Sequence, residues 1–377
     1  PREAAGKSFV LLKNEGLLPV TLGKKTAFIG PYTDNKEIIS SWAILGDVAS
    51  CVTIKEAAEK VFDPGLTTFH PGSPVLSERE LKGLVGFGPG KPVSVSEEEQ
   101  EKLLQEAVEA AKEADLVIMP LGEHYLQSGE ATSRGMIDLP EAQVRLLREV
   151  AKVNENIAVV LFTGRPLDLR EVSRIARSVL VVWLPGTEGG AAVVDALTGK
   201  VNPSGKLPMS FPYCTGQIPV HYNAYSPGRP DNVGEVRFRS KYIDIPNEPL
   251  YPFGYGLSYT KFEISPVKLS GGVVTDEKAV TAGVTVKNTG ERAGTEVVQL
   301  YLQDIAASVV RPVRELKGFV KVELEAGEEK EITFVIDEPM LRFLRADGTV
   351  GSEEGEFNLF IGNSSDTENR AKFRYEA

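Results

Sequence analysis

The stretch "GEHYLQSGEATSR", residues 122–134, holds two carboxylates, a histidine and an arginine. It directly follows the apolar run "ADLVIMPL", so these charged groups gather where a predicted strand ends. One interpretation is a solvated surface turn. The other is a catalytic loop at the edge of an α/β sheet, because ligands bind beyond the carboxyl ends of the strands in such sheets.

Glu130 is the residue of this stretch best suited to general acid–base chemistry. Its neighbours Gly129 and Ala131 carry little bulk, which would let the carboxylate reach into a neighbouring site. A general acid must hold its proton near neutral pH, which an apolar pocket or a second carboxylate favours. The alternative is that Glu130 is one of 53 acidic residues and simply lies on a solvated loop.

The other polar residues of the stretch are expected to support the loop. We expect Glu123 to pair with a base or cap the loop, and Arg134 to be the partner of a loop carboxylate. His124 is expected to be a hydrogen-bonded loop histidine, and Ser128 belongs to a pliable Ser-Gly pair. Further along, "PGTEGG" (185–190) is interpreted as a helix-start turn and not as an anion site, because Glu188 would repel a phosphate.

Two further loops are predicted to share the same sheet edge. They are "GPYTDNKEIISSWAIL", after the first strand, and "TGRPLDL", after the strand ending at Phe162. The sequence contains no GxSxG motif, so this signature of a serine nucleophile is missing. A retaining glycosidase would need a second carboxylate about 5 Å from the acid, and the spacing of the residues singles none out.

The elements that must position these loops alternate between strands and helices over residues 24–212. Apolar runs such as "DLVIMPLG", "IAVVLFTG" and "SVLVVWLPG" are separated by amphipathic segments. One of these, residues 97–114, is a predicted helix that begins at a capping box of Ser96 and Glu99. Strands that are apolar throughout predict an α/β fold with a mostly parallel sheet, flanked by helices on both faces.

The rest of the chain predicts a different architecture. Residues 213–258 are rich in Pro, Gly, Tyr and Asn and are expected to form an ordered connector. Residues 259–377 contain short segments in which apolar and polar residues alternate, separated by turns such as "NTGERAG". This pattern predicts an all-β sandwich of the immunoglobulin or fibronectin type III kind.

Composition narrows the classes of partner. A net charge of −11 disfavours nucleic acid and anionic membranes, and no apolar run is long enough to span a bilayer. The three histidines lack metal-ligand spacing, so we expect no metal site and no cofactor. Cys51 and Cys214 form no CxxC motif and are interpreted as buried small hydrophobes, with a disulfide or a reactive thiol as the alternative.

Several long motifs resemble the C-terminal half of glycoside hydrolase family 3, which contains many β-glucosidases. Residues 1–23, with "REAAGKSFVLLKNEGLLPV", resemble the linker helix and loop that follow the (β/α)8 barrel of that family. "SSWAILGDVASCVTI" resembles its Gly-Ser-Trp loop, and "SGEATSRGMIDLP" its acid/base loop. Other matching stretches are "WLPGTEGGAAVVDALTGKVNPSGKLPMSFP", "EPLYPFGYGLSYTKFEIS" and, for the fibronectin-like tail, "VRELKGFVKVELEAGEEKEITFVID".

The resemblance implies roles for individual residues. Glu130 falls on the family's general acid/base, while Ser41 and Trp42 fall on a loop that touches the sugar. The family's nucleophile is an aspartate in the barrel, which this sequence does not contain. The chain would therefore supply the acid/base of a retaining, exo-acting β-glucosidase, to a barrel on the same precursor or another chain, and would be inactive without it.

The resemblance also leaves alternatives open. The substrate could instead be a β-xyloside or another β-glycoside, and the isolated chain could be a non-catalytic sugar-binding or scaffold module. The sequence leaves open whether the chain forms a homo-oligomer and whether it is cytoplasmic, periplasmic or secreted.

Overall fold

The computed structural model describes residues 1–43, 46–82, 84, 95–229 and 238–377. These residues form two compact units, one of residues 1–205 and 214–216, the other of residues 206–213 and 217–377. Residues 206–212, expected in the α/β domain, lie in the second unit because Leu207 and Phe211 form backbone hydrogen bonds with Tyr255 and Tyr251.

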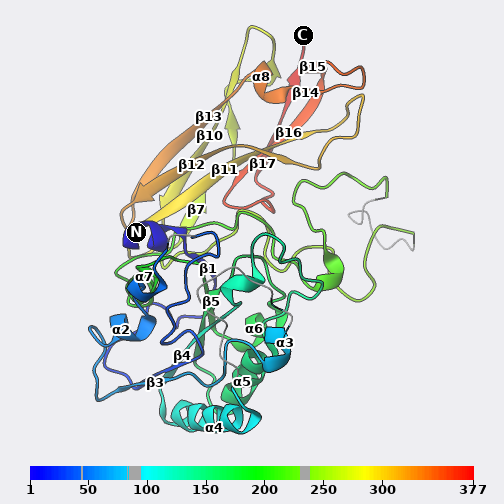
Figure 1. The fold of residues 1–377 in the computed structure, drawn as a ribbon. Helices are drawn as coiled ribbons and strands as arrows, with labels where there is room; N and C mark the ends of the chain where they lie inside the picture. Colours follow the sequence, from blue (N-terminus) through cyan, green and yellow to red (C-terminus); the bar gives the residue numbers. More distant parts are fainter. Residues whose placement is uncertain (44–45, 83, 85–94, 230–237) are drawn as a thin grey trace. The chain divides into compact units, whose positions relative to one another are not determined.

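The first unit, drawn in blue to green in Figure 1, is built on a mostly parallel six-stranded sheet. Its strand order is β1-β6-β5-β4-β2-β3. Its five parallel strands are β2 (Thr26–Ile29), β3 (Thr67–His70), β4 (Leu116–Gly122), β5 (Ile157–Phe162) and β6 (Ser178–Trp183). Every residue of β4 and β5 is buried, as the continuous apolar runs predict. The α/β prediction is confirmed.

One edge of this sheet was expected to be a loop. After helix α1 (Arg2–Ser8), residues Val10–Asn14 form strand β1, which pairs antiparallel with β6. Val10 lies opposite Val181, and Val10, Leu11 and Leu12 are buried. The pairing partner lies far along the chain, so the local sequence does not reveal this strand.

Helices cover the sheet in two groups. From β2 the chain moves to one edge of the sheet at β3, and from β4 it moves the other way through β5 and β6. Because crossovers between parallel strands are right-handed, the helices that connect strands in one direction lie on one face and those in the other direction lie on the opposite face. In agreement, α1 and α2 pack against α7, while α5 packs against both α4 and α6 (Figure 1). The bounds are α2 (Ile54–Ala58), α4 (Glu97–Glu113), α5 (Glu141–Ala151), α6 (Arg170–Ile175) and α7 (Gly189–Leu197), with short α3 (Glu78–Lys82) before α4.

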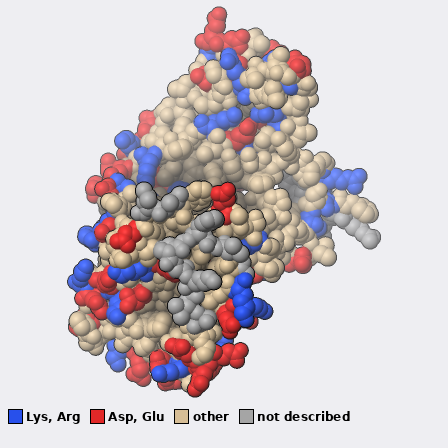
Figure 2. All heavy atoms as spheres, in the orientation of Figure 1, with Lys and Arg blue, Asp and Glu red and all other residues tan. Residues whose placement is uncertain are grey.

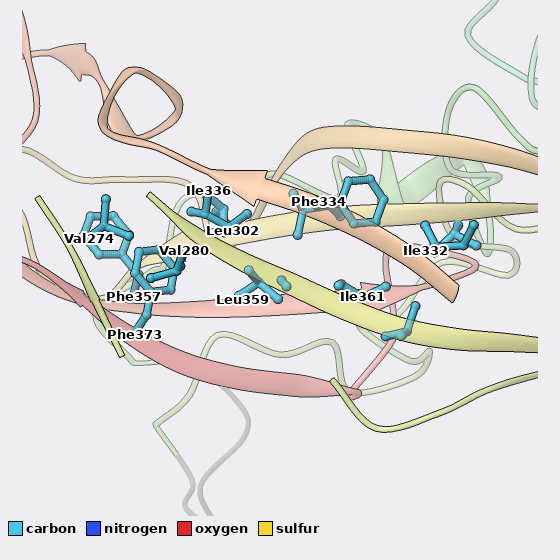
Figure 3. Close-up of a cluster of buried hydrophobic side chains, with 14 of the residues drawn as sticks. Val274, Val280, Leu302, Ile332, Phe334, Ile336, Phe357, Leu359, Ile361 and Phe373 are labelled. Atoms are coloured by element: carbon cyan, nitrogen blue, oxygen red, sulfur yellow. The ribbon is translucent and has the colours of Figure 1, made fainter. Parts of the chain in front are cut away.

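The second unit contains the predicted sandwich. One sheet has the order β13-β10-β7, with β8 also paired to β10, and the other has the order β12-β11-β16-β17-β9. The alternating apolar residues of the sequence meet between the sheets, as Leu302, Phe334 and Leu359 show in Figure 3. The bounds are β7 (Phe262–Ile264), β8 (Lys268–Leu269), β9 (Val273–Val274), β10 (Val280–Asn288), β11 (Gly294–Asp304), β12 (Glu315–Leu324), β13 (Glu329–Ile336), β16 (Gly355–Gly362) and β17 (Arg370–Tyr375).

Smaller features complete the second unit. Helix α8 (Glu338–Leu341) precedes a hairpin of β14 (Phe343–Leu344) and β15 (Val350–Gly351). Near the end of the predicted connector, the Gly254 carbonyl accepts a hydrogen bond from Gln299 Nε2 of the larger sheet at 3.0 Å. Both cysteines are free, with Cys51 buried and Cys214 half-buried.

Surface charge is mixed in both units. Lys and Arg side chains are interspersed with Asp and Glu on the visible face (Figure 2). No helix among the described residues combines the length and the apolar character needed to cross a bilayer.

Candidate active site

The candidate site lies where the order of the parallel strands reverses. β2 is flanked by β3 on one side and by β4 on the other, so chain connections leave in opposite directions between β2 and β4. In open α/β sheets, ligands bind beyond the carboxyl ends of the strands at such a point. The loop after β2 contains Ser41 and Trp42, and the loop after β4 contains Glu130. The topology therefore brings both predicted loops to one place.

Glu130 lies on an exposed turn with an unusual backbone. Gly129 has φ 131° and Ala131 has φ 58°. The left-handed conformation of a residue with a Cβ costs roughly 1–2 kcal/mol, and such strain concentrates at functional sites. The Glu130 carboxylate makes no hydrogen bond or ion pair with another described residue. It is exposed and unpaired, which suits a group that must meet a substrate.

Ser41 and Trp42 lie directly beside this turn. A Cβ built on Gly129 would lie 3.0 Å from Ser41 Oγ and 3.8 Å from the Trp42 ring. The absence of a side chain at Gly129 thus permits close approach of the two loops. Trp42 is 60% exposed, so most of its ring is available to a ligand. The structure therefore brings Ser41 and Trp42 next to the turn that carries Glu130.

Glu123 occupies the opposite kind of environment. It is 1% exposed, and its Oε1 lies 2.7 Å from Arg134 Nη1 and 3.1 Å from Arg165 Nε. Its Oε2 accepts a hydrogen bond from the Thr163 hydroxyl at 2.7 Å. The expected pairing of Glu123 with a base, and of Arg134 with a loop carboxylate, is confirmed. With both oxygens engaged, Glu123 holds the loop together and is not free to react.

Arg165 is a site residue that the sequence did not single out. Its Nη2 donates hydrogen bonds to the carbonyls of Gln127 and Thr132, the latter at 2.8 Å. It follows β5 in the "TGRPLDL" loop, which was predicted to reach this edge, but nothing in that loop distinguished the arginine. A Cβ on the preceding residue, Gly164, would overlap Ser128 Oγ. The loop after β5 therefore packs directly against the loop that carries Glu130.

His124 is buried and hydrogen-bonded, as predicted. Its Nδ1 accepts from the Leu126 N–H at 3.2 Å, so in the assigned tautomer Nε2 carries the proton. Nε2 lies 3.1 Å from the carboxylate of Glu37, in the loop after β2. The histidine therefore ties the two loops together. Glu37 was another residue that the sequence did not reveal.

Tyr32 adds a second link between the same loops. Its buried hydroxyl donates to the Glu123 carbonyl, and its ring stacks on Phe162 with centroids 4.6 Å apart. Burial raises the pKa of this phenol well above its usual value, and the carboxylates of Glu37 and Glu123 raise it further. Tyr32 consequently remains a hydrogen-bond donor throughout the neutral range.

The stretch "PGTEGG" forms the predicted helix-start turn. A Cβ on Gly190 would overlap the Thr53 backbone, and the Gly190 N–H donates to the Val52 carbonyl at 3.1 Å. Protein backbone thus fills the space that an anion would need. Within the described ranges, no group of three or more His, Cys, Asp or Glu side chains is placed to hold a metal ion.

Comparison with known proteins agrees with the sequence motifs. Residues 9–259 match the glycosyl hydrolase family 3 C-terminal domain, and residues 296–365 match a fibronectin type III-like domain. A periplasmic beta-glucosidase from Salmonella typhimurium is 40% identical over 97% of this chain and 48% of its own length. A putative beta-xylosidase from Formosa agariphila is 35% identical over 97% of this chain and 45% of its own length.

A solved structure shows the same architecture. The beta-glucosidase from Listeria innocua, in complex with isofagomine, superposes with a TM-score of 0.87 at 37% identity, covering 100% of this chain and 49% of that protein. The chain thus spans about half the length of the relatives it matches. It belongs to glycoside hydrolase family 3 and comprises that family's C-terminal domain followed by a fibronectin type III-like domain.

Proposed function

We propose that this chain is part of a retaining, exo-acting β-glucosidase that releases terminal β-D-glucosyl residues, with Glu130 as its general acid/base. One observation carries the proposal: an exposed, unpaired carboxylate lies on a strained turn at the strand-order reversal, beside Ser41 and Trp42. Tryptophan faces and hydroxyls are suited to binding a sugar ring, which has an apolar face and polar edges.

The catalytic nucleophile comes from outside this chain. In a retaining mechanism an aspartate attacks the anomeric carbon while Glu130 protonates the departing oxygen. Glu130, now ionised, then removes a proton from the water that hydrolyses the glycosyl-enzyme. Glu123 is locked in its ion pairs, which supports a nucleophile on a separate (β/α)8 barrel. Relatives about twice as long have room for such a domain.

The direct test replaces Glu130 by glutamine in the complete enzyme, this chain together with its barrel. We expect kcat/KM for glucosides with poor leaving groups to fall by about 10²–10⁴-fold, because no acid protonates the leaving oxygen. Glucosides with good leaving groups should react much better in the first step. Azide should then raise turnover, because it attacks the glycosyl-enzyme without needing a base.

A matched control is Glu113→Gln. Glu113 is also exposed, but it precedes β4 and so lies near the opposite edge of the sheet. It should leave kcat/KM unchanged. Near wild-type rates for Glu130→Gln on poor leaving groups would refute the assignment of the acid/base.

Two alternatives are separated by simple assays. The similarity to a putative beta-xylosidase keeps β-xylosides as candidate substrates, so matched aryl β-glucosides and β-xylosides should be compared on the complete enzyme. A non-catalytic sugar-binding or scaffold module would show no turnover with or without a barrel. We expect the isolated chain to be inactive and to contribute to activity only with the barrel present.

A further inference from the structure

The turn that carries Glu130, residues 127–132, is hydrogen-bonded to the loop after β5 through the guanidinium of Arg165. Arg165 Nη2 donates to the carbonyl of Gln127, three residues before Glu130, and to that of Thr132, two residues after it. The two bonds therefore bracket the turn on both sides of the glutamate. Its Nε lies 3.1 Å from the carboxylate of the buried Glu123, an ion pair without a hydrogen bond, and Glu123 compensates the charge of the arginine.

The turn needs such support because its own backbone is unfavourable. Ala131 has φ 58°, a left-handed conformation that persists in a residue with a Cβ only where the surroundings enforce it, whereas Gly129 adopts its positive φ without that cost. Thr132 Oγ1 donates to the Gly129 carbonyl at 2.6 Å, a local bond that closes the turn but does not attach it to the sheet. Arg165, which follows β5, provides that attachment to the sheet.

We infer that Arg165 is a positioning residue for the general acid/base: it fixes Glu130 in its reactive position by bridging the carbonyls of Gln127 and Thr132. This inference rests on the proposed role of Glu130. Planarity and several donors make arginine suited to bridging two acceptors at fixed geometry, whereas a lysine ammonium is a point charge on a flexible stem. Arg165→Lys keeps the charge beside Glu123 but loses the bridge.

The test compares leaving groups in the complete enzyme. For Arg165→Lys we expect kcat/KM on aryl glucosides with poor leaving groups to fall by about 10²-fold, the effect of misplacing a catalytic group by about 1 Å. With a dinitrophenyl glucoside, whose departure needs little protonation, kcat/KM should stay within about twofold of wild type. A merely structural role would lower both values equally, through loss of folded enzyme.

Two further variants make the result decisive. Arg148→Lys is the matched control, because Arg148 is also paired with a glutamate, Glu171 of α6, but makes no bond to the turn that carries Glu130. It should leave the leaving-group dependence unchanged. Gly164→Ala keeps Arg165 but drives a methyl group into Ser128, so it should steepen that dependence even if the lysine variant fails to fold.

The outcomes distinguish this inference from the proposed function. A steep leaving-group dependence for Glu130→Gln together with a wild-type dependence for both Arg165→Lys and Gly164→Ala would refute the positioning role and leave the acid/base intact. A wild-type dependence for Glu130→Gln would refute both. Steep dependence in all three, with Arg148→Lys unchanged, supports both.

Discussion

Two regions of the molecule contain buried side chains of different kinds. One is the carboxyl edge of the sheet in the first unit, and the other is the interior of the sandwich in the second unit. At the edge, Glu123, His124 and Thr163 are at most 1% exposed: Glu123 forms ion pairs with Arg134 and Arg165, Thr163 donates to Glu123, and His124 is hydrogen-bonded to Glu37. In the sandwich, the core is lined by Val, Leu, Ile and Phe.

This difference separates two requirements of a folded protein, overall stability and the fixed geometry of particular loops. Apolar burial is strong but non-directional, so it holds the sandwich together without fixing one particular loop shape. Ion pairs and hydrogen bonds depend on direction, and burying them costs desolvation free energy. We interpret the polar edge as the region where loop geometry is specified, and the sandwich as a region that mainly supplies stability.

Glu123→Gln should give the largest loss of stability. It would leave Arg134 and Arg165 without their buried counter-charge, which costs about 3–5 kcal/mol of unfolding free energy. Both tryptophans, Trp42 and Trp183, lie in the first unit, so urea unfolding followed by tryptophan fluorescence reports on it. As a control, Glu101→Gln breaks an exposed pair with Arg145 and should cost less than about 1 kcal/mol. Equal losses of unfolding free energy in the two variants would show that the buried ion pairs of Glu123 matter no more than an exposed one.

Leu300→Ala tests the apolar core of the sandwich in the second unit. Leu300 is fully buried between the sheets, and its truncation should cost about 2–5 kcal/mol through lost burial and the resulting cavity. Far-ultraviolet circular dichroism should show the earlier unfolding of the β unit, while the tryptophan transition should stay in place. Leu344→Ala, on an exposed side chain, should change stability by less than about 0.5 kcal/mol. A shift in the tryptophan signal as well would show that the units unfold together.

Local patterns predicted the elements of both regions well. The helix expected at 97–114 is α4, Glu97–Glu113, and the Ser96 side chain accepts from the Glu99 N–H at its start. The apolar runs became β4, β5 and β6, and the alternating segments became the sandwich strands. These features depend on neighbours within a few residues, so the sequence contains their signal.

Long-range polar contacts could not be predicted in the same way. The pairing of Glu123 with Arg165 and of His124 with Glu37 joins different loops, and any of many charged residues could have filled those roles. The left-handed Ala131 was equally hidden, because alanine normally avoids that conformation. The sequence therefore predicted which loops reach this edge of the sheet, while the contacts that hold those loops together became visible only in the fold.

A smaller effect, and a pH-dependent one, is expected at Asp195, which joins α7 to α1. Burial tends to raise its pKa, but hydrogen bonds from Arg2 and Lys200, with their charges, outweigh burial and lower it. The ionised form thus stabilises the folded state above the unfolded pKa of about 3.9, and this contribution is lost as the pH falls through the lowered folded pKa. Asp195→Asn should cost about 1 kcal/mol at pH 7, because Arg2 is half exposed, and the difference should shrink in acid.

Asp304 of the second unit should show the opposite sign. Burial raises its pKa, and the positive charge of Arg311 only partly offsets this. Above the raised pKa the folded state carries the cost of a buried carboxylate, and as the pH falls through that value the folded state binds a proton before the unfolded state does. Asp304→Asn should therefore stabilise the protein at pH 7, with a gain that shrinks in acid. The measurement is urea unfolding by circular dichroism from pH 7 downward. A loss of stability at pH 7 would instead mean that Arg311 depends on this carboxylate more than burial penalises it.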